Sequence, residues 1–151
     1  MTAPPATPPQ VIAALQLALG AEHAAIFGYA ALGPWLPTAQ ATRAHRDEAA
    51  HRAARDALIV AVAAGGQTPI PSAGSYAVPS KLDSAASARR YALSLETTCC
   101  QQWRYVVAVG AGAAPAVVVD AVRNLTASAV RATQWRTALT PGAPTTAFPG
   151  I

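Results

Sequence analysis

The stretch from Arg46 to Asp56 contains the residue pair with the clearest chemical potential in this sequence, Glu48-x-x-His51. On a helix, a carboxylate and an imidazole three positions apart lie one above the other on the same face. Four-helix bundles that hold two iron or manganese ions use two such pairs together with two further glutamates. The pair therefore raises the question of whether the remaining ligands of such a centre are present.

Two further glutamates have the spacing that this centre requires. Glu22 and Glu48 each lie thirteen positions from Trp35, in the expected first turn, so antiparallel helices place them at one height. Glu96 lies about 24 Å from the second expected turn, near Gly112, and Glu22 lies about 20 Å from the first. If the second and third helices run parallel, the three carboxylates meet near the middle of the bundle.

The fourth expected helix does not supply the missing ligands, because it carries Ser128-x-x-Arg131 where Glu-x-x-His is required. A guanidinium is always charged and pairs well with carboxylates. We therefore expect a metal-free centre in which Arg131, helped by Arg55 and His51, neutralises the inward acids. The predicted polar core cluster consists of Glu22, Glu48, His51, Arg55, Glu96, Ser128 and Arg131. The alternative is an iron or manganese site whose ligands are Glu22, Glu48, His51 and Glu96.

Apolar residues at helical spacing predict the elements that must position these side chains. Thr38 is expected to cap the second helix, and Asp83 or Ser84 the third. The long connection Gly65–Lys81 is unusual in a helical domain unless it crosses the whole bundle, which its extended length allows. The prediction is an all-α, ferritin-like four-helix bundle over residues 10–140, with a disordered proline-rich segment 1–9 and an irregular tail 141–151. The expected helices span about 11–32, 38–64, 84–110 and 116–139.

The composition favours closely packed helices and argues against several partners. Hydrophobic residues make up 52% of the chain and charged residues 12%, and many of the apolar residues are alanine. The net charge of +4 comes from scattered arginines and not from a basic cluster, so no nucleic-acid partner is expected. The apolar segment Tyr105–Val119 is interrupted and too short to span a membrane, and no secretory signal is apparent. The adjacent Cys99 and Cys100 indicate free thiols in a reducing cytoplasm.

Five segments carry a resemblance to other proteins: Ala18–Gly33, Ala50–Leu58, Leu95–Val107, Arg131–Thr140 and Ala147–Gly150. Together they resemble an uncharacterised actinobacterial family that is classed as a ferritin-like domain of unknown function. This resemblance implies a ferritin-like bundle that is cytoplasmic and forms a homodimer, and it brings no established activity. The sequence departs from the oxygen-activating members of that fold at Ser128 and Arg131.

Three classes of function remain open, and a non-enzymatic role is favoured. The first is a metal-free bundle whose polar centre is structural or binds a small molecule. The second is a divergent mono- or di-metal oxidoreductase, and the third is a dimeric interaction module. A nucleophilic Cys99 with His51 as its base has little support. Asp47 and Asp56 are expected to pair with arginines on a solvated face. Four aromatic residues could line an apolar ligand pocket, but they are expected to belong to the hydrophobic core: Tyr29, Trp103, Tyr105 and Trp135.

Overall fold

The structure is a computed structural model that describes residues 6–142, 145 and 150 of the 151-residue chain. The disorder expected for residues 1–9 therefore falls partly outside the described residues, and so does most of the tail expected for residues 141–151. Pro9 already belongs to the first helix, as proline commonly does at a first helical position, where no backbone N–H is needed.

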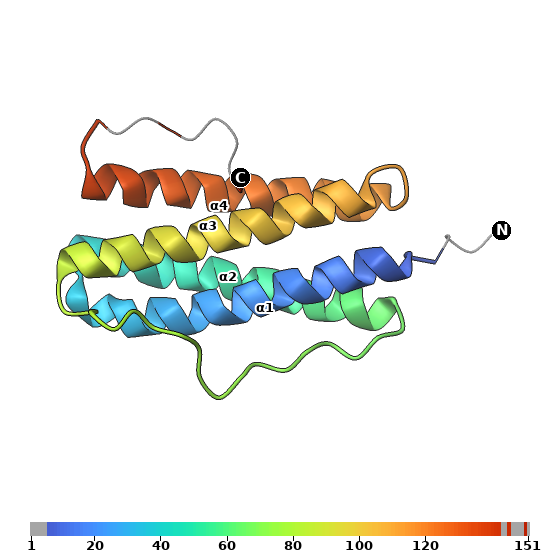
Figure 1. Ribbon diagram of the computed structural model, residues 1–151, viewed down its shortest axis with the longest axis horizontal. Coiled ribbons are helices and arrows are strands. Elements are labelled where there is room, and N and C mark those ends of the chain that lie inside the picture. The colour runs from blue at the N-terminus through green and yellow to red at the C-terminus, as the bar shows by residue number, and fades with distance from the viewer. Residues whose placement is uncertain (1–5, 143–144, 146–149, 151) are drawn as a thin grey trace.

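The described part of the chain folds into four long α-helices and contains no strand (Figure 1). A short 3-10 helix, η1 (Gly33–Trp35), makes the first turn. The all-α four-helix bundle predicted from the sequence is confirmed. The helices are α1 (Pro9–Leu32), α2 (Thr38–Ala64), α3 (Ala85–Gly110) and α4 (Pro115–Leu139).

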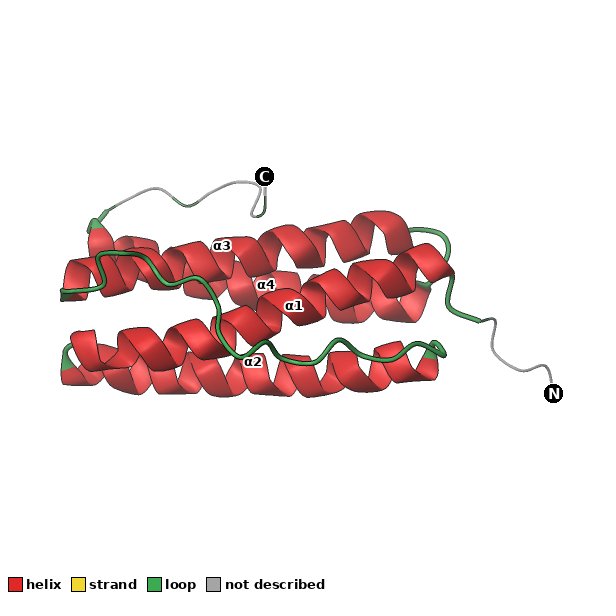
Figure 2. Cartoon of the chain, turned by 60° about the horizontal axis from the view of Figure 1, so that its bottom comes forward, coloured by secondary structure: helices red, strands yellow, loops and turns green. Residues whose placement is uncertain are grey.

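The order of directions in the bundle follows from the long connection between α2 and α3. α1 and α2 form one antiparallel hairpin and α3 and α4 a second, and α2 and α3 run in the same direction (Figure 1). The connection returns along the outside of the bundle beside α1 (Figure 2). Gln16 on α1 holds it there, donating to the Thr68 carbonyl oxygen at 2.7 Å and accepting from the Ile70 N–H at 2.9 Å. The predicted crossover and the parallel arrangement of the second and third helices are confirmed.

The residue predicted to cap α3 does so, whereas the residue predicted to cap α2 does not. The Ser84 hydroxyl accepts from the Ser87 N–H and forms a capping box with it, so α3 begins where the sequence predicted. Thr38 was expected to be the cap of α2, but it is the first helical residue, and Pro37 occupies the cap position without a side-chain hydrogen bond. Pro37 has an extended backbone there, which suits a residue that precedes a helix.

α1 is the most apolar helix, and it belongs to the core. By length and composition Pro9–Trp35 could cross a membrane, but 61% of its most apolar window is buried inside the molecule. Its buried residues contribute to two apolar clusters that lie toward opposite ends of the bundle. One contains Leu15, Leu19 and Trp103, and the other contains Tyr29 and Trp135. Buried charged residues lie between these two clusters, at the middle height of the helices.

Candidate polar centre

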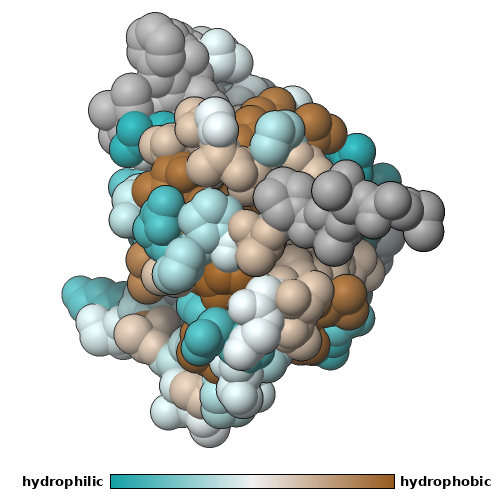
Figure 3. Space-filling model, turned by 90° about the vertical axis from the view of Figure 1, so that its right-hand side faces the viewer, coloured by the Kyte–Doolittle hydropathy of each residue, from teal (hydrophilic) through white to brown (hydrophobic). Residues whose placement is uncertain are grey.

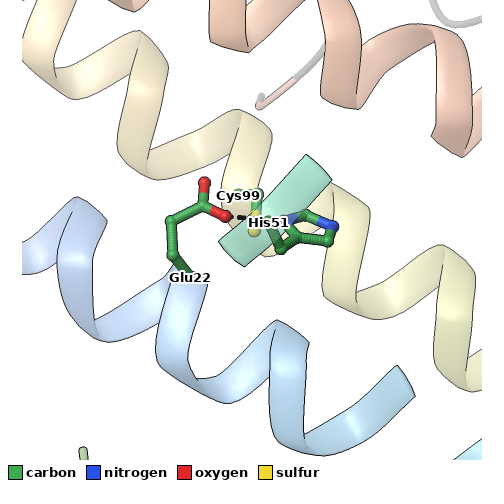
Figure 4. Close-up of side chains that lie close together, drawn as sticks. All are labelled: Glu22, His51 and Cys99. Carbon is green, nitrogen blue, oxygen red and sulfur yellow. Dashed lines mark hydrogen bonds and ion pairs between the residues drawn. The ribbon is translucent and has the colours of Figure 1, made fainter. Parts of the chain in front are cut away.

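His51 lies at the middle of the bundle between two glutamates from different helices. Its Nδ1 is 2.6 Å from Glu22 Oε2, and its Nε2 is 3.0 Å from Glu96 Oε1. All three side chains are buried, with exposed fractions of 1% or less. Because carboxylate oxygens only accept, an imidazole that faces one on each side must donate from both nitrogens and is therefore protonated. Figure 4 shows the Glu22 carboxylate pointing at the His51 ring beside Cys99.

Glu96 accepts hydrogen bonds from three different helices. Its Oε1 accepts from the Tyr29 hydroxyl at 2.6 Å and from Arg131 Nε at 2.8 Å, in addition to His51. The other carboxylate oxygen, Oε2, has no partner among the described residues and is fully buried. Glu22 accepts a further bond on Oε1 from the Trp103 indole N–H at 2.7 Å. The two carboxylates thus receive donors from all four helices.

A second layer of aromatic and polar groups surrounds this centre. The Trp135 indole N–H is shared between the Tyr29 hydroxyl at 2.8 Å and Asp47 Oδ2 at 3.2 Å. Arg131 also donates from its terminal nitrogen to the Ser128 hydroxyl at 2.9 Å, and so is held in its inward orientation. The network therefore connects Asp47 on α2 to Ser128 on α4 through side chains alone.

The electrostatics of the centre favour one charged state. Burial by itself lowers the pKa of His51, but the hydrogen bonds and charges of Glu22 and Glu96 outweigh burial and raise this pKa to about 9. For Glu96, burial favours the neutral form, yet His51 and Arg131 together lower its pKa below the ordinary value. At neutral pH the imidazolium and the guanidinium therefore face two carboxylates.

In the groups around the centre, burial favours the neutral form. Burial, reinforced by the charge of Glu96, raises the pKa of Asp47 above its ordinary value. The same two causes raise the pKa of the Tyr29 hydroxyl, which remains a hydrogen-bond donor. Burial first, and then the charge of Glu22, raises the pKa of the Cys99 thiol. A neutral, buried thiol is a poor nucleophile, and both His51 nitrogens face carboxylates, so the electrostatics give no support to Cys99 acting with His51 as its base.

Five of the seven residues predicted for the polar cluster lie in it, and two do not. Glu22, His51, Glu96, Ser128 and Arg131 are connected by the hydrogen bonds described above. Glu48 and Arg55 lie apart from them, which corrects the predicted cluster. The partly exposed Glu48 accepts from Arg52 one turn further along α2, at 3.1 Å from its Nε, and Arg55 pairs with its neighbour Asp56.

The rotation of α2 explains the displacement of Glu48. Asp47 and His51 lie one helical turn apart on the buried face, together with Ala44 and Leu58. Glu48 is rotated by about 100° from Asp47, because each residue of an α-helix advances by about that angle. Spacing along the chain gives the position of Glu48 along the helix axis and not its direction around that axis. Asp47, expected on a solvated face, is the acid that α2 turns inward.

The aromatic members of the network were predicted as plain core, although their spacing contained a signal. Tyr29 follows Glu22, Trp103 follows Glu96 and Trp135 follows Ser128, each by seven positions. Positions seven apart lie on one helix face, two turns along. A carboxylate that points into the core can therefore accept a hydrogen bond from an indole N–H or a hydroxyl on the inward face of a neighbouring helix. Such donors are what a buried carboxylate requires.

The donor set fits a di-metal centre poorly and a single ion somewhat better. Ligand atoms of Glu22, His51 and Cys99 lie within 4.8 Å of one another and are all buried. A second ion would need ligands from α4, which presents Ser128 and the cation Arg131 instead. Even the first ion would have to displace the proton on His51 that bridges it to Glu22. The chemistry of these donors therefore suits an ion-pair network better than a pair of metal ions.

The comparisons with known proteins agree with the fold and leave the activity open. The model of the family DUF4439, described as a domain of unknown function, matches residues 14–151. No curated protein matches the chain. A solved structure, that of the conserved hypothetical protein rv2844 from Mycobacterium tuberculosis, is similar, with a TM-score of 0.81 and 37% sequence identity. The similarity covers 93% of this chain and 97% of that one.

Proposed function

This chain belongs to the DUF4439 family, and we propose that it is a ferritin-like protein whose centre is a metal-free ion-pair network without oxidative chemistry. The observation that carries the proposal is the hydrogen bond from Arg131 Nε to Glu96 Oε1 at 2.8 Å. In a di-metal bundle, the equivalent position of the fourth helix supplies a metal ligand. Here it supplies a permanent cation.

The charges of the centre balance without a metal ion. Two cations, His51 and Arg131, face two carboxylates, Glu22 and Glu96. A metal ion placed among these groups would meet two positive charges and would have to displace hydrogen bonds that already satisfy the donors. Buried charges persist when they are paired in this way.

The role that we assign to the centre is to specify how the four helices associate. Each helix contributes a member of the network, so a vertical slip of any helix would strand a buried charge, which is strongly unfavourable. Such a scaffold suits a binding or interaction protein. Two adjacent free thiols support a reducing, cytoplasmic location, and the exposed Leu17 and Tyr105 support a homodimer.

A single-metal site is the second candidate, and one observation favours it. Glu22, His51 and Cys99 present a carboxylate, an imidazole and a thiol within 4.8 Å, which is a donor set that zinc or iron uses. The fully buried Glu96 Oε2, without a partner among the described residues, would be available as a fourth donor after rearrangement.

Metal loading separates the two candidates. The protein, expressed in medium rich in iron, manganese and zinc, is expected to carry far less than one metal ion per chain by elemental analysis. Titration with cobalt(II) is expected to give no thiolate charge-transfer band. One equivalent of tightly bound metal, together with a cobalt–thiolate band that is lost in Cys99→Ser, would contradict the metal-free centre and establish the single-metal site.

A further inference from the structure

The contact between α2 and α4 is closed along only half of its length. α3 packs along both α1 and α4, and α1 along α2, but no comparable packing joins α2 to α4 over the described residues. In the half nearer the start of α2, long side chains bridge the gap. The Arg43 guanidinium lies over the Trp135 ring at 5.5 Å, and Asp47 accepts from the same indole.

In the other half, the α2 residues that line the gap above the buried Leu58 are alanines, whose methyl groups are too short to bridge to α4. The result is an apolar groove with a volume of about 480 Å³. Its α2 wall extends over about 16 Å, from Ala50 to Ala61, at the rise of an α-helix. The wall is formed by Ala50, Ala53, Ala54, Ala57 and Ala61.

The floor of the groove reaches the polar centre. Leu15, Leu58 and Trp103 form it, and each is almost fully buried beneath the opening. The other edge of Trp103 donates its indole N–H to Glu22 at 2.7 Å. Pockets of this size, mostly apolar and with a few polar groups at one side, are typical of small-molecule sites.

The polar groups of the groove lie on α4 and include one cation. Arg123 donates to Asp120 Oδ1 at 3.1 Å in a pair that is largely exposed on both sides. A guanidinium has five N–H donors, and only this one bond occupies it among the described residues. The Asn124 amide lies in the same wall and donates to the Asp120 carbonyl oxygen. The rim can therefore accept an anionic end group beside an apolar body.

We propose that the α2–α4 groove binds an elongated apolar molecule that ends in a carboxylate, such as a medium-chain fatty acid. The chain lies along the alanine wall above Trp103, and the carboxylate takes the unoccupied N–H groups of Arg123. The net charge of +4 favours an anionic ligand over a cationic one. The end of the molecule where α2 finishes and α4 starts shows apolar patches between polar ones (Figure 3). The proposal does not depend on the metal content of the centre.

A helix from a second copy is the competing occupant, and the dimensions of the groove argue against it. An α-helix with its side chains is about 10–12 Å across, whereas this groove has the volume of one small molecule. The exposed pair Asp120–Arg123 at the rim would also have to lose water on both partners in such an interface.

Calorimetric titration with dodecanoate, kept below its micelle concentration, tests the proposal. Ala57 lines the groove and is exposed, so Ala57→Leu fills the space without reaching the core. Ala49 is equally exposed on the same helix but is not among the groove-lining residues, so Ala49→Leu is the matched control. The parent and the control should bind with a 1:1 stoichiometry, and Ala57→Leu about tenfold or more weakly.

Two further comparisons test the placement of the ligand. Arg123→Gln should weaken dodecanoate binding about tenfold and leave the binding of dodecanol nearly unchanged. In a Trp35→Phe background, dodecanoate should shift the tryptophan emission, because Trp103 lies in the floor.

Absence of binding, equal binding by Ala57→Leu and Ala49→Leu, or equal affinity for dodecanol would overturn the proposal. A dimer in sedimentation that Ala57→Leu alone dissociates would identify the groove as a subunit interface and overturn it too. None of these measurements involves metal. The groove proposal can therefore fail while the metal-free centre holds, and the metal-free centre can fail while the groove proposal holds.

Discussion

At the scale of single residues, the centre of this bundle is determined by which side chains can donate. Glu22 and Glu96 only accept, so every group that touches them must bring a proton: both imidazole N–H groups of His51, the indole N–H of Trp103, a phenol and a guanidinium. His51 satisfies both carboxylates at once because it is charged. Arg131 completes the set from α4 and gives the buried Glu96 a second cationic partner beside His51.

Removal of Arg131 should be costly near neutral pH. In Arg131→Met, Glu96 keeps its burial but loses one of its two cationic partners, so the free energy of unfolding is expected to fall by about 3 kcal/mol. In the parent, the lowered pKa of Glu96 contributes stability above its ordinary value of 4.5 that is lost as the pH falls further. The variant lacks part of this contribution. Its deficit should therefore narrow toward pH 4, as chemical denaturation at several pH values can show.

The matched control is Arg123→Met, the same change on the same helix at a side chain that is 73% exposed. It should alter the unfolding free energy by less than about 0.5 kcal/mol. If both variants unfold alike at pH 7, Arg131 does not neutralise a buried charge.

At the scale of elements, α1 and α3 approach closely because α1 carries glycine where they meet. A Cβ built on Gly28 would lie 2.5 Å from Leu95 Cδ1 and 2.9 Å from the Tyr91 hydroxyl. Gly28 and Leu95 directly precede Tyr29 and Glu96 in their helices, so the separation of the two helices also determines the reach of the hydrogen bond between Tyr29 and Glu96. A wider separation would loosen the centre.

Two glycine substitutions within α1 should therefore have opposite effects. Gly28→Ala must move Leu95 and Tyr91 and is expected to destabilise the protein by about 1–3 kcal/mol. Gly20→Ala meets only Ile70 Cδ1, at 3.4 Å, and should stabilise it by up to about 1 kcal/mol through helix propensity. Thermal and chemical unfolding of the two variants will show whether the sign differs. A neutral or stabilising Gly28→Ala would contradict the close packing of α1 on α3.

At the scale of the whole molecule, the buried histidine links global stability to pH. The pKa of His51 is raised from 6.5 to about 9 in the folded protein. The protonated form is therefore favoured by folding. Its contribution is complete below about pH 6.5 and is lost as the pH rises through 9. That contribution is about 3 kcal/mol, at about 1.4 kcal/mol for each pH unit of the shift.

The unfolding free energy is accordingly expected to decline by most of that amount between pH 7 and pH 10. Ring ¹⁵N NMR should show both nitrogens of His51 protonated at pH 7, with titration near pH 9. This measurement separates His51 from the thiols, since burial raises the pKa of Cys100 to about 11. A His51 that titrates near 6.5, or unfolding that is unchanged up to pH 10, would show that the doubly bonded imidazolium does not form.

The sequence by itself determined the bundle, the crossover and the height of its polar layer. These properties depend on helix length, turn position and linker length, which are counted along the chain. They predict that Glu22, His51, Glu96 and Arg131 lie at one level, and hydrogen bonds connect these four side chains in the structure.

Only the tertiary structure decided which side of α2 faces the core. Glu48 and Asp47 are adjacent acids with nearly the same height, and a rotation of the helix by one residue exchanges them. That rotation is set by the packing of Ala44, Leu58 and Val62 against the other helices, a balance of many apolar contacts that motif spacing does not contain. The open half of the α2–α4 contact has the same origin, because a groove exists only where two facing helices both fail to fill the space between them.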